Sequence, residues 1–220
     1  MDKKELALLL DISAVKAEMS IKDVINAAEF ACVYGCKSCV TLPYMTPDLG
    51  EYLHLHNPAV KLCGVSGFPF GAETTRTKVE TARELILGGC SEIDMVMNIG
   101  AFKSGRYADV ISDVKNVKDA CGDAILKVII ETGYLDADEI CRASELVVKG
   151  NADFVKTSTG FIKPTTVEMI KLIKKTVGNS AQIKAAGGIR SLSVIEEMIA
   201  EGASRFGMNA VSAASVFKEL

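Results

Sequence analysis

Three lysines and one aspartate lie inside short apolar segments of the sequence, where charged side chains are uncommon. They are Lys127, Lys156, Lys184 and Asp94, and the residues around each are typical of a buried strand. A buried ammonium group loses its solvation, so it must find a counter-ion or give up its proton. A lysine that has given up its proton is a nucleophile. These four residues are therefore the first candidates for a catalytic site.

Two interpretations of this cluster follow from the residues alone. One is a structural salt-bridge network in which Asp94 and Glu131 neutralise the lysines. The other is catalysis, because Lys156 and Lys184 on neighbouring strands repel each other as cations, which should lower the pKa of one of them. A neutral amine can form a Schiff base with a carbonyl compound, and Asp94 can move the protons of that reaction. For the four residues together we favour catalysis.

The segments that must position these residues alternate between strand and helix signals. Short apolar strands are expected at residues 8–13, 38–41, 61–67, 92–97, 125–131, 152–156, 182–186 and 204–207. Helices are expected at residues 20–35, 47–55, 75–88, 106–122, 136–149, 165–175, 193–202 and 208–220. Ser20 should cap its helix, and Thr165 with Glu168 and Ser193 with Glu196 have capping-box spacing.

Strands that are continuously apolar, rather than alternating, are typical of a parallel sheet covered on both faces. Eight of them alternating with helices predict an α/β fold, a (β/α)8 TIM barrel, as a single domain over residues 1–220. A doubly wound open sheet also fits the alternation, but no strand is followed by a Gly-x-Gly-x-x-Gly turn or a P-loop. In a barrel the four candidates would converge at the carboxyl ends of the strands.

The composition disfavours several classes of function. Lysine and arginine number 25 against 28 acidic residues, a net charge of -3 without a dense basic cluster, so neither nucleic acid nor an acidic membrane is expected as a partner. No apolar run reaches the roughly 18 residues of a membrane span, and the amino terminus lacks a convincing signal peptide, which favours a cytoplasmic protein. Seven scattered cysteines fit reduced thiols.

Metal-binding motifs are weak in this sequence. No His-x-His or comparable ligand set occurs, so we expect neither a metal nor a cofactor, and His54 and His56 are expected on the surface. Cys32, Cys36 and Cys39 have the spacing of the cluster loop of radical S-adenosylmethionine enzymes. We favour buried thiols, because Cys32 is expected on a helix and Cys39 inside the second strand.

Five segments, in this order, resemble the signature blocks of deoxyribose-phosphate aldolases. They are residues 65–72, 92–96, 126–133, 153–160 and 184–190. The resemblance covers nearly the whole chain and implies a class I aldolase on a (β/α)8 barrel. Such an enzyme reversibly joins acetaldehyde and glyceraldehyde 3-phosphate into 2-deoxyribose 5-phosphate. It implies small aldehydes and sugar phosphates as ligands, and a homodimer is compatible with the sequence.

The resemblance also implies roles for individual residues. Lys156 would carry the Schiff base, Lys184 would be the cation that lowers its pKa, Asp94 would relay protons, and Lys127 would be a supporting charge. The residues that would bind the substrate and its phosphate are Thr159, Gly160, Gly187, Gly188, Gly207 and Asn209.

The sequence departs from the family pattern at the predicted phosphate site. Residues 162–166 replace a glycine-rich segment, Met208-Asn209-Ala210 stands where paired serines are common, and Leu220 ends the chain without a tyrosine. Lys163 and Arg190 are expected to be ordinary solvated loop charges, although either side chain can hold a phosphate. An alternative is therefore a related Schiff-base aldolase that acts on a different or unphosphorylated aldehyde.

Overall fold

Eight parallel strands close into a barrel in the order of the sequence in the computed structural model, which describes residues 1–220. The strands are β1 (Leu10–Ala14), β2 (Ser38–Thr41), β3 (Lys61–Ser66), β4 (Glu92–Val96), β5 (Ile125–Ile129), β6 (Phe154–Lys156), β7 (Gln182–Ala186) and β8 (Arg205–Met208). Each strand pairs with the next, and β8 closes on β1. The predicted (β/α)8 TIM barrel is confirmed.

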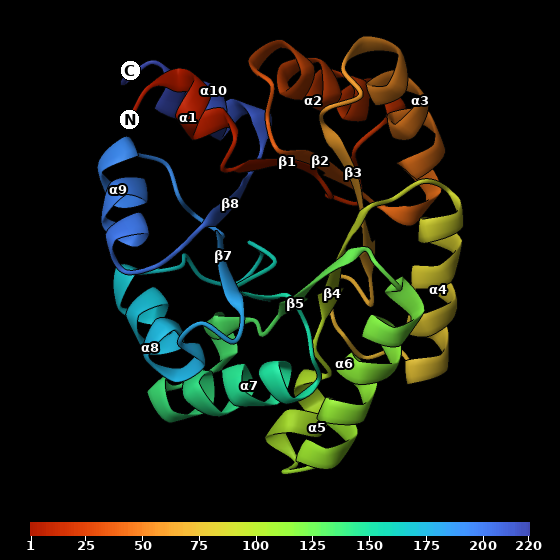
Figure 1. Cartoon of the computed structure of the whole chain (residues 1–220), viewed down its shortest axis with the longest axis vertical. Helices are drawn as coiled ribbons and strands as arrows, with labels where there is room; N and C mark the ends of the chain where they lie inside the picture. The colour runs from red at the N-terminus through yellow and green to blue at the C-terminus, as the bar shows by residue number, and fades with distance from the viewer.

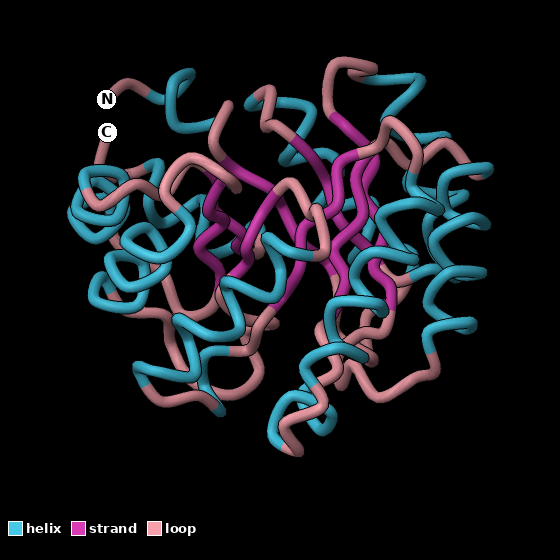
Figure 2. The backbone as a smooth tube through the Cα atoms, turned by 60° about the horizontal axis from the view of Figure 1, so that its bottom comes forward, coloured by secondary structure: helices cyan, strands magenta, loops and turns pink.

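Helices form a ring around the barrel (Figure 1), and the view in Figure 2 shows the strands enclosed by them. They are α1 (Lys3–Ala7), α2 (Ile21–Tyr34), α3 (Thr46–His56), α4 (Thr75–Leu87), α5 (Ile99–Lys103), α6 (Tyr107–Cys121), α7 (Ala137–Lys149), α8 (Val167–Val177), α9 (Leu192–Ala200) and α10 (Ala210–Phe217). Two 3₁₀ turns, η1 (Pro43–Met45) and η2 (Thr132–Tyr134), follow β2 and β5. No helix is both long and apolar enough to cross a membrane.

The hydrophobic core lies between the strands and the helix ring, as α7 illustrates. Its apolar residues Ile140, Ala143 and Val147 recur at helical spacing and are buried in a core cluster of 50 residues. Asp136 caps the helix by accepting from the backbone N–H of Glu139, whose side chain accepts from Asp136 N in return. Helix α7 therefore begins where its cap is satisfied and is held by its buried face.

Two predicted helix caps are wrong, although Ser20 caps α2 as expected. The cap of α8 is Thr166, one residue later than predicted, because the buried Thr165 hydroxyl donates instead to the carbonyl of Ala186 at 2.6 Å. Helix α9 begins at Leu192, before the predicted Ser193 cap, and the Leu192 N–H donates to Glu219 at 2.9 Å. In both places a contact from a distant part of the chain decides the helix start.

The short helices α1 and α5 were not expected from the periodicity, because five residues are too few for an apolar face to recur. Asp2 and Asn98 cap them, each through a side-chain oxygen that accepts from a backbone N–H three residues later. The longer helices and all strands lie within a few residues of the predicted ranges.

Candidate active site

Strand register brings the four candidate residues together inside the barrel. Asp94 on β4 lies opposite Lys127 on β5, and Lys156 on β6 lies opposite Lys184 on β7. All four side chains are buried. Inward-pointing residues of a barrel form layers that fill its interior. The side chains of one pair can therefore contact those of the other pair inside the barrel.

The carboxylate of Asp94 is the centre of this cluster. Its Oδ2 accepts from Lys156 Nζ at 2.6 Å and from Lys184 Nζ at 2.8 Å, and its Oδ1 accepts from Lys127 Nζ at 2.9 Å. Burial alone would raise the pKa of Asp94, but the three lysines outweigh burial and hold it well below the ordinary value. Asp94 is therefore ionised and bridges the three amines.

Three further buried charges complete the network, and the sequence analysis missed them. Asp11 forms ion pairs with Lys184 and with Arg205, each at 2.6 Å. Glu92 contacts Lys127 at 2.6 Å and Arg205 at 3.2 Å. A signal was present, because all three lie within or at the start of apolar strand segments, as the four candidates do.

Counting charges identifies the lysine that lacks its own counter-ion. The network holds four cations, Lys127, Lys156, Lys184 and Arg205, against three carboxylates, Asp11, Glu92 and Asp94. Lys156 contacts only Asp94, whereas Lys184 contacts two carboxylates and Lys127 contacts three. A charge balance is reached when Lys156 is neutral.

The pKa directions agree with this count. Burial lowers the pKa of Lys156, the cation of Lys184 lowers it further, and Asp94 only partly opposes them. Burial also disfavours the charged form of Lys184, but Asp11 and Asp94 outweigh it and raise the pKa. Burial disfavours the charged form of Lys127 too, but Asp94 and other neighbours outweigh it and raise the pKa of Lys127 well above its ordinary value. Of the three lysines, only Lys156 is poised to act as a nucleophile.

Lys156 is also the residue that a ligand would meet. It lines a cavity of about 380 Å³ together with Lys184, and its exposed fraction of 7% compares with 0% for Asp94 and Lys127. Lys127 does not line the cavity, and it acts there only through its hydrogen bond to Asp94. The cavity opens among the loops that follow the strands, as expected for a barrel enzyme.

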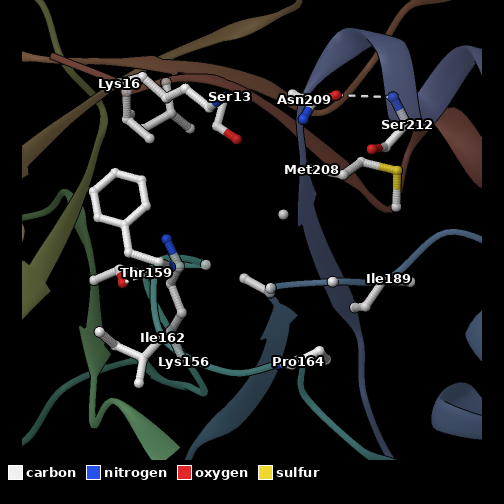
Figure 3. A pocket seen from close by; sticks show the side chains of 18 of the residues that line it. Ser13, Lys16, Lys156, Thr159, Ile162, Pro164, Ile189, Met208, Asn209 and Ser212 are labelled. Atoms are coloured by element: carbon white, nitrogen blue, oxygen red, sulfur yellow. Dashed lines mark hydrogen bonds between the residues drawn. The ribbon is translucent and has the colours of Figure 1, made fainter. Parts of the chain in front are cut away.

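The predicted substrate-binding residues Thr159, Gly160, Gly187, Gly188, Gly207 and Asn209 all line this cavity. Figure 3 shows Lys156 and Thr159 near one wall, Ser13 and Lys16 above them, and Asn209 with Ser212 at the far side. Asn209 Oδ1 accepts from Ser212 N at 2.8 Å, so its amide nitrogen is the part that can donate to a ligand.

Glycines let two of the loops that line the cavity approach each other. A Cβ on Gly187 would lie 3.3 Å from Gly160 Cα, and one on Gly188 would lie 2.6 Å from Pro164 Cβ. Gly160, Gly187 and Gly188 also have positive φ angles. Larger residues would therefore separate these loops and change the cavity.

The lining carries positive charge and no carboxylate. Lys16, Lys163 and Arg190 line the cavity in addition to Lys156 and Lys184, and no aspartate or glutamate does. Lys163 and Arg190 are exposed, as predicted, but they lie at the cavity mouth rather than on an unrelated surface. The missed Lys16 comes from the loop after β1. Such a cavity favours an anionic ligand.

The salt-bridge network that the sequence offers as an alternative interpretation is present around Asp94, but its other carboxylates are Asp11 and Glu92 rather than Glu131. Glu131 does not neutralise the lysines: it follows β5 and accepts from Thr159. Cys32 lies on α2 and Cys39 on β2, as expected, and burial raises the pKa of Cys36 to about 12, so this thiol stays protonated. No group of three or more His, Cys, Asp or Glu side chains is arranged to hold a metal ion.

Comparison with known proteins places the chain among aldolases. The model of the DeoC/LacD family of aldolases matches residues 1–213. The deoxyribose-phosphate aldolases of Sinorhizobium medicae and Aciduliprofundum boonei are 42% and 43% identical, over 98% and 94% of this chain and 87% and 94% of theirs. The structure of a tetrameric deoxyribose-phosphate aldolase from Aeropyrum pernix superimposes with a TM-score of 0.90 and 26% identity, over 99% of this chain and 92% of that one.

Proposed function

This chain belongs to the DeoC/LacD family of aldolases, and we propose that it reversibly cleaves 2-deoxy-D-ribose 5-phosphate to acetaldehyde and D-glyceraldehyde 3-phosphate through a Schiff base on Lys156. Its similarity to curated deoxyribose-phosphate aldolases supports the lyase activity. The observation that carries the residue assignment is the charge count, in which Lys156 is the one cation of the network without its own carboxylate.

The reaction begins with attack by neutral Lys156 on the aldehyde carbon of the open-chain sugar. The amine nitrogen forms a bond to this carbon, and the resulting carbinolamine loses water to give an iminium ion. Asp94 Oδ2 lies 2.6 Å from Lys156 Nζ, so it can take the proton that the amine loses on attack. Asp94 passes that proton to the alkoxide oxygen, and a second proton, from the ammonium group of Lys184, allows the hydroxyl to leave as water.

Carbon–carbon cleavage then uses the iminium ion as an electron sink. The hydroxyl on carbon 3 loses its proton, the bond between carbons 2 and 3 breaks, and its electron pair forms an enamine on Lys156. Glyceraldehyde 3-phosphate leaves with the new carbonyl group. Protonation of the enamine carbon and hydrolysis of the imine release acetaldehyde and restore the free amine. We assign the proton transfers to the Asp94–Lys184 pair, in which the two groups are 2.8 Å apart.

The substrate phosphate is assigned to the end of the cavity formed by Gly187, Gly188, Gly207 and Asn209. Glycine amides and the Asn209 amide are suitable donors, and Arg190 and Lys16 supply positive charge from the rim. These cations compensate for the paired serines that the sequence lacks, which supports a phosphorylated substrate.

A second candidate is an aldolase for an unphosphorylated aldehyde, and one observation favours it. Met208, which is 5% exposed, places an apolar side chain beside Asn209 in the cavity lining. A comparison of kcat/KM for 2-deoxyribose 5-phosphate and 2-deoxyribose separates the two candidates. A strong preference for the phosphorylated sugar supports the first, and equal values support the second.

The Schiff base is tested by borohydride reduction in the presence of acetaldehyde. We expect the protein to gain the mass of C2H4, because one ethyl group replaces a hydrogen of the amine, and peptide mapping should place the ethyl group on Lys156. Lys156→Ala should not be labelled at that position, whereas Lys175→Ala, on the exposed surface of α8, should be labelled like the wild type. An unlabelled wild-type protein, or a label only on other lysines, would contradict the proposal.

A further inference from the structure

Glu131 is a buried acidic residue that the proposed reaction does not use. Its exposed fraction is 2%, and it lies just after β5 with a φ angle of 53°, a left-handed conformation that is uncommon for a residue other than glycine. Oε2 makes two hydrogen bonds, while Oε1 has no partner in the protein. A buried, incompletely satisfied carboxylate on a strained backbone is costly, so its position calls for a function.

Both hydrogen bonds of Glu131 come from Thr159 in the cavity lining. The Thr159 backbone N–H donates to Oε2 at 3.0 Å, and its hydroxyl donates to the same oxygen in a short hydrogen bond. A hydroxyl has one hydrogen, so Thr159 cannot donate to a ligand while this contact exists. Its oxygen can only accept. It already accepts from the Phe161 N–H at 3.3 Å, so one acceptor position remains for a ligand. The charge-assisted bond to the carboxylate makes that oxygen a better acceptor.

We propose that Glu131 is a positioning residue that turns Thr159 into a hydrogen-bond acceptor, so that the site selects an acceptor aldehyde with a hydroxyl next to its carbonyl carbon. This inference rests on the proposed function. In that reaction the acceptor carbonyl carbon bonds to the enamine on Lys156, and the phosphate lies at the far end of the cavity. The hydroxyl of the acceptor lies between its carbonyl carbon and its phosphate. It should therefore lie next to Thr159, which is three residues after Lys156 and lines the same wall of the cavity.

Other contacts hold the two loops together without Glu131. Thr132 N donates to the Thr157 carbonyl at 2.9 Å, and the hydroxyls of Thr132 and Ser158 are 2.9 Å apart. A Cβ on Gly133 would also come within 3.0 Å of Ile162, which shows how closely η2 packs on the loop after β6. The loop should therefore stay in place when the Glu131 side chain is changed.

The selection is measured with two acceptors, D-glyceraldehyde and 3-hydroxypropanal, which differ only by the hydroxyl next to the carbonyl. Acetaldehyde is the donor, and the readout is the ratio of kcat/KM for the two acceptors. Glu131→Asn shortens the side chain by one methylene, so that it no longer reaches Thr159, and asparagine tolerates a positive φ angle. We expect it to reduce the preference for glyceraldehyde about tenfold, as expected for the loss of one hydrogen bond.

Two further variants separate this role from a general loss of structure. Glu131→Gln keeps an oxygen acceptor for both Thr159 donors and should retain most of the preference. Thr159→Val removes the hydroxyl and should lose the preference as Glu131→Asn does, and the double variant should be no worse than Thr159→Val alone, because the two residues act through one contact.

The inference is overturned if Glu131→Asn keeps the wild-type ratio, or if it lowers kcat/KM equally for both acceptors. Borohydride labelling of Lys156 with acetaldehyde is measured in every variant. If Lys156 of the wild type is not labelled, the proposed function itself is contradicted. If Lys156 is labelled normally but Glu131→Asn keeps the wild-type acceptor ratio, only the role of Glu131 is contradicted.

Discussion

Lys156 and Lys184 lie opposite each other on strands β6 and β7, and both amines contact the same oxygen, Oδ2 of Asp94. Of these two amines, only that of Lys184 also contacts Asp11, at 2.6 Å, so the two amines do not share their counter-ions equally. Lys184 remains a cation, and its charge lowers the pKa of Lys156 next to it. The chemistry of the pair depends on this asymmetry.

Replacing Lys184 by leucine should move the pH profile of the enzyme upwards. Lys184→Leu removes a repulsive charge, so the pKa of Lys156 rises towards its ordinary value. The neutral amine exists above its pKa, so the rising part of the kcat/KM profile moves to higher pH. At a fixed pH below the pKa, the fraction of neutral amine falls about tenfold when the pKa of Lys156 rises by about 1, and the rate falls with it. Lys175→Leu, an exposed control, should leave the profile in place, and an unchanged profile for Lys184→Leu would exclude the role of this residue.

Replacing Asp94 by asparagine should separate Schiff-base formation from turnover. Asp94→Asn removes the acceptor that lies between the two amines, and loss of a general acid–base group lowers kcat by about 10² to 10⁴-fold. Asp94 raises the pKa of Lys156, so the variant retains a neutral amine. Prolonged borohydride reduction with acetaldehyde should still label Lys156. Turnover close to that of the wild type would show that another group moves the protons.

Replacing Arg205 by methionine should destabilise the barrel. Arg205 is 5% exposed and contacts Asp11 and Glu92, so Arg205→Met leaves buried carboxylates short of a counter-ion. Loss of one member of a buried ion pair costs about 3–5 kcal/mol. Urea unfolding followed by circular dichroism measures the free energy of unfolding. The matched control is Arg83→Met, which breaks an exposed pair with Glu80 and should cost about 0–1 kcal/mol; equal losses would show that the buried network does not stabilise the fold.

Replacing Arg190 by methionine should weaken binding of the phosphorylated substrate selectively. Arg190 lines the cavity from the loop after β7. A hydrogen bond from a charged group contributes about 1.5–3 kcal/mol, so KM for 2-deoxyribose 5-phosphate should rise about 10- to 100-fold. KM for unphosphorylated 2-deoxyribose serves as the internal control and should change little. An equal rise for both sugars would place Arg190 away from the phosphate.

The four candidate residues could be found from the sequence because a charge inside an apolar strand is costly wherever the strand lies. The same reasoning applies to Asp11, Glu92 and Arg205. Glu92 and Arg205 lie near the starts of their predicted segments, and Asp11 lies at the polar end of its own, where a charge is expected to reach solvent. Their burial follows from the closed barrel, in which even the first residues of β4 and β8 point into the interior.

The predicted caps at Thr165 and Ser193 failed for a related reason. Capping patterns describe what a segment does with its own side chains. Thr165 donates to Ala186 on another strand, and Glu219 at the end of the chain accepts from the first residue of α9. Contacts of this kind cannot be read from the spacing of neighbouring residues.

The sequence by itself determined the barrel, the order of its strands and the lysines and aspartate that belong to its interior, because apolar periodicity and buried charge are local properties of the chain. Only the tertiary structure decided which charges meet. Lys184 and Asp94 are 90 residues apart in sequence, and Arg205 and Asp11 are 194 apart. Closure of the barrel and the register of its strands bring them into contact, and these contacts leave Lys156 as the cation without its own carboxylate.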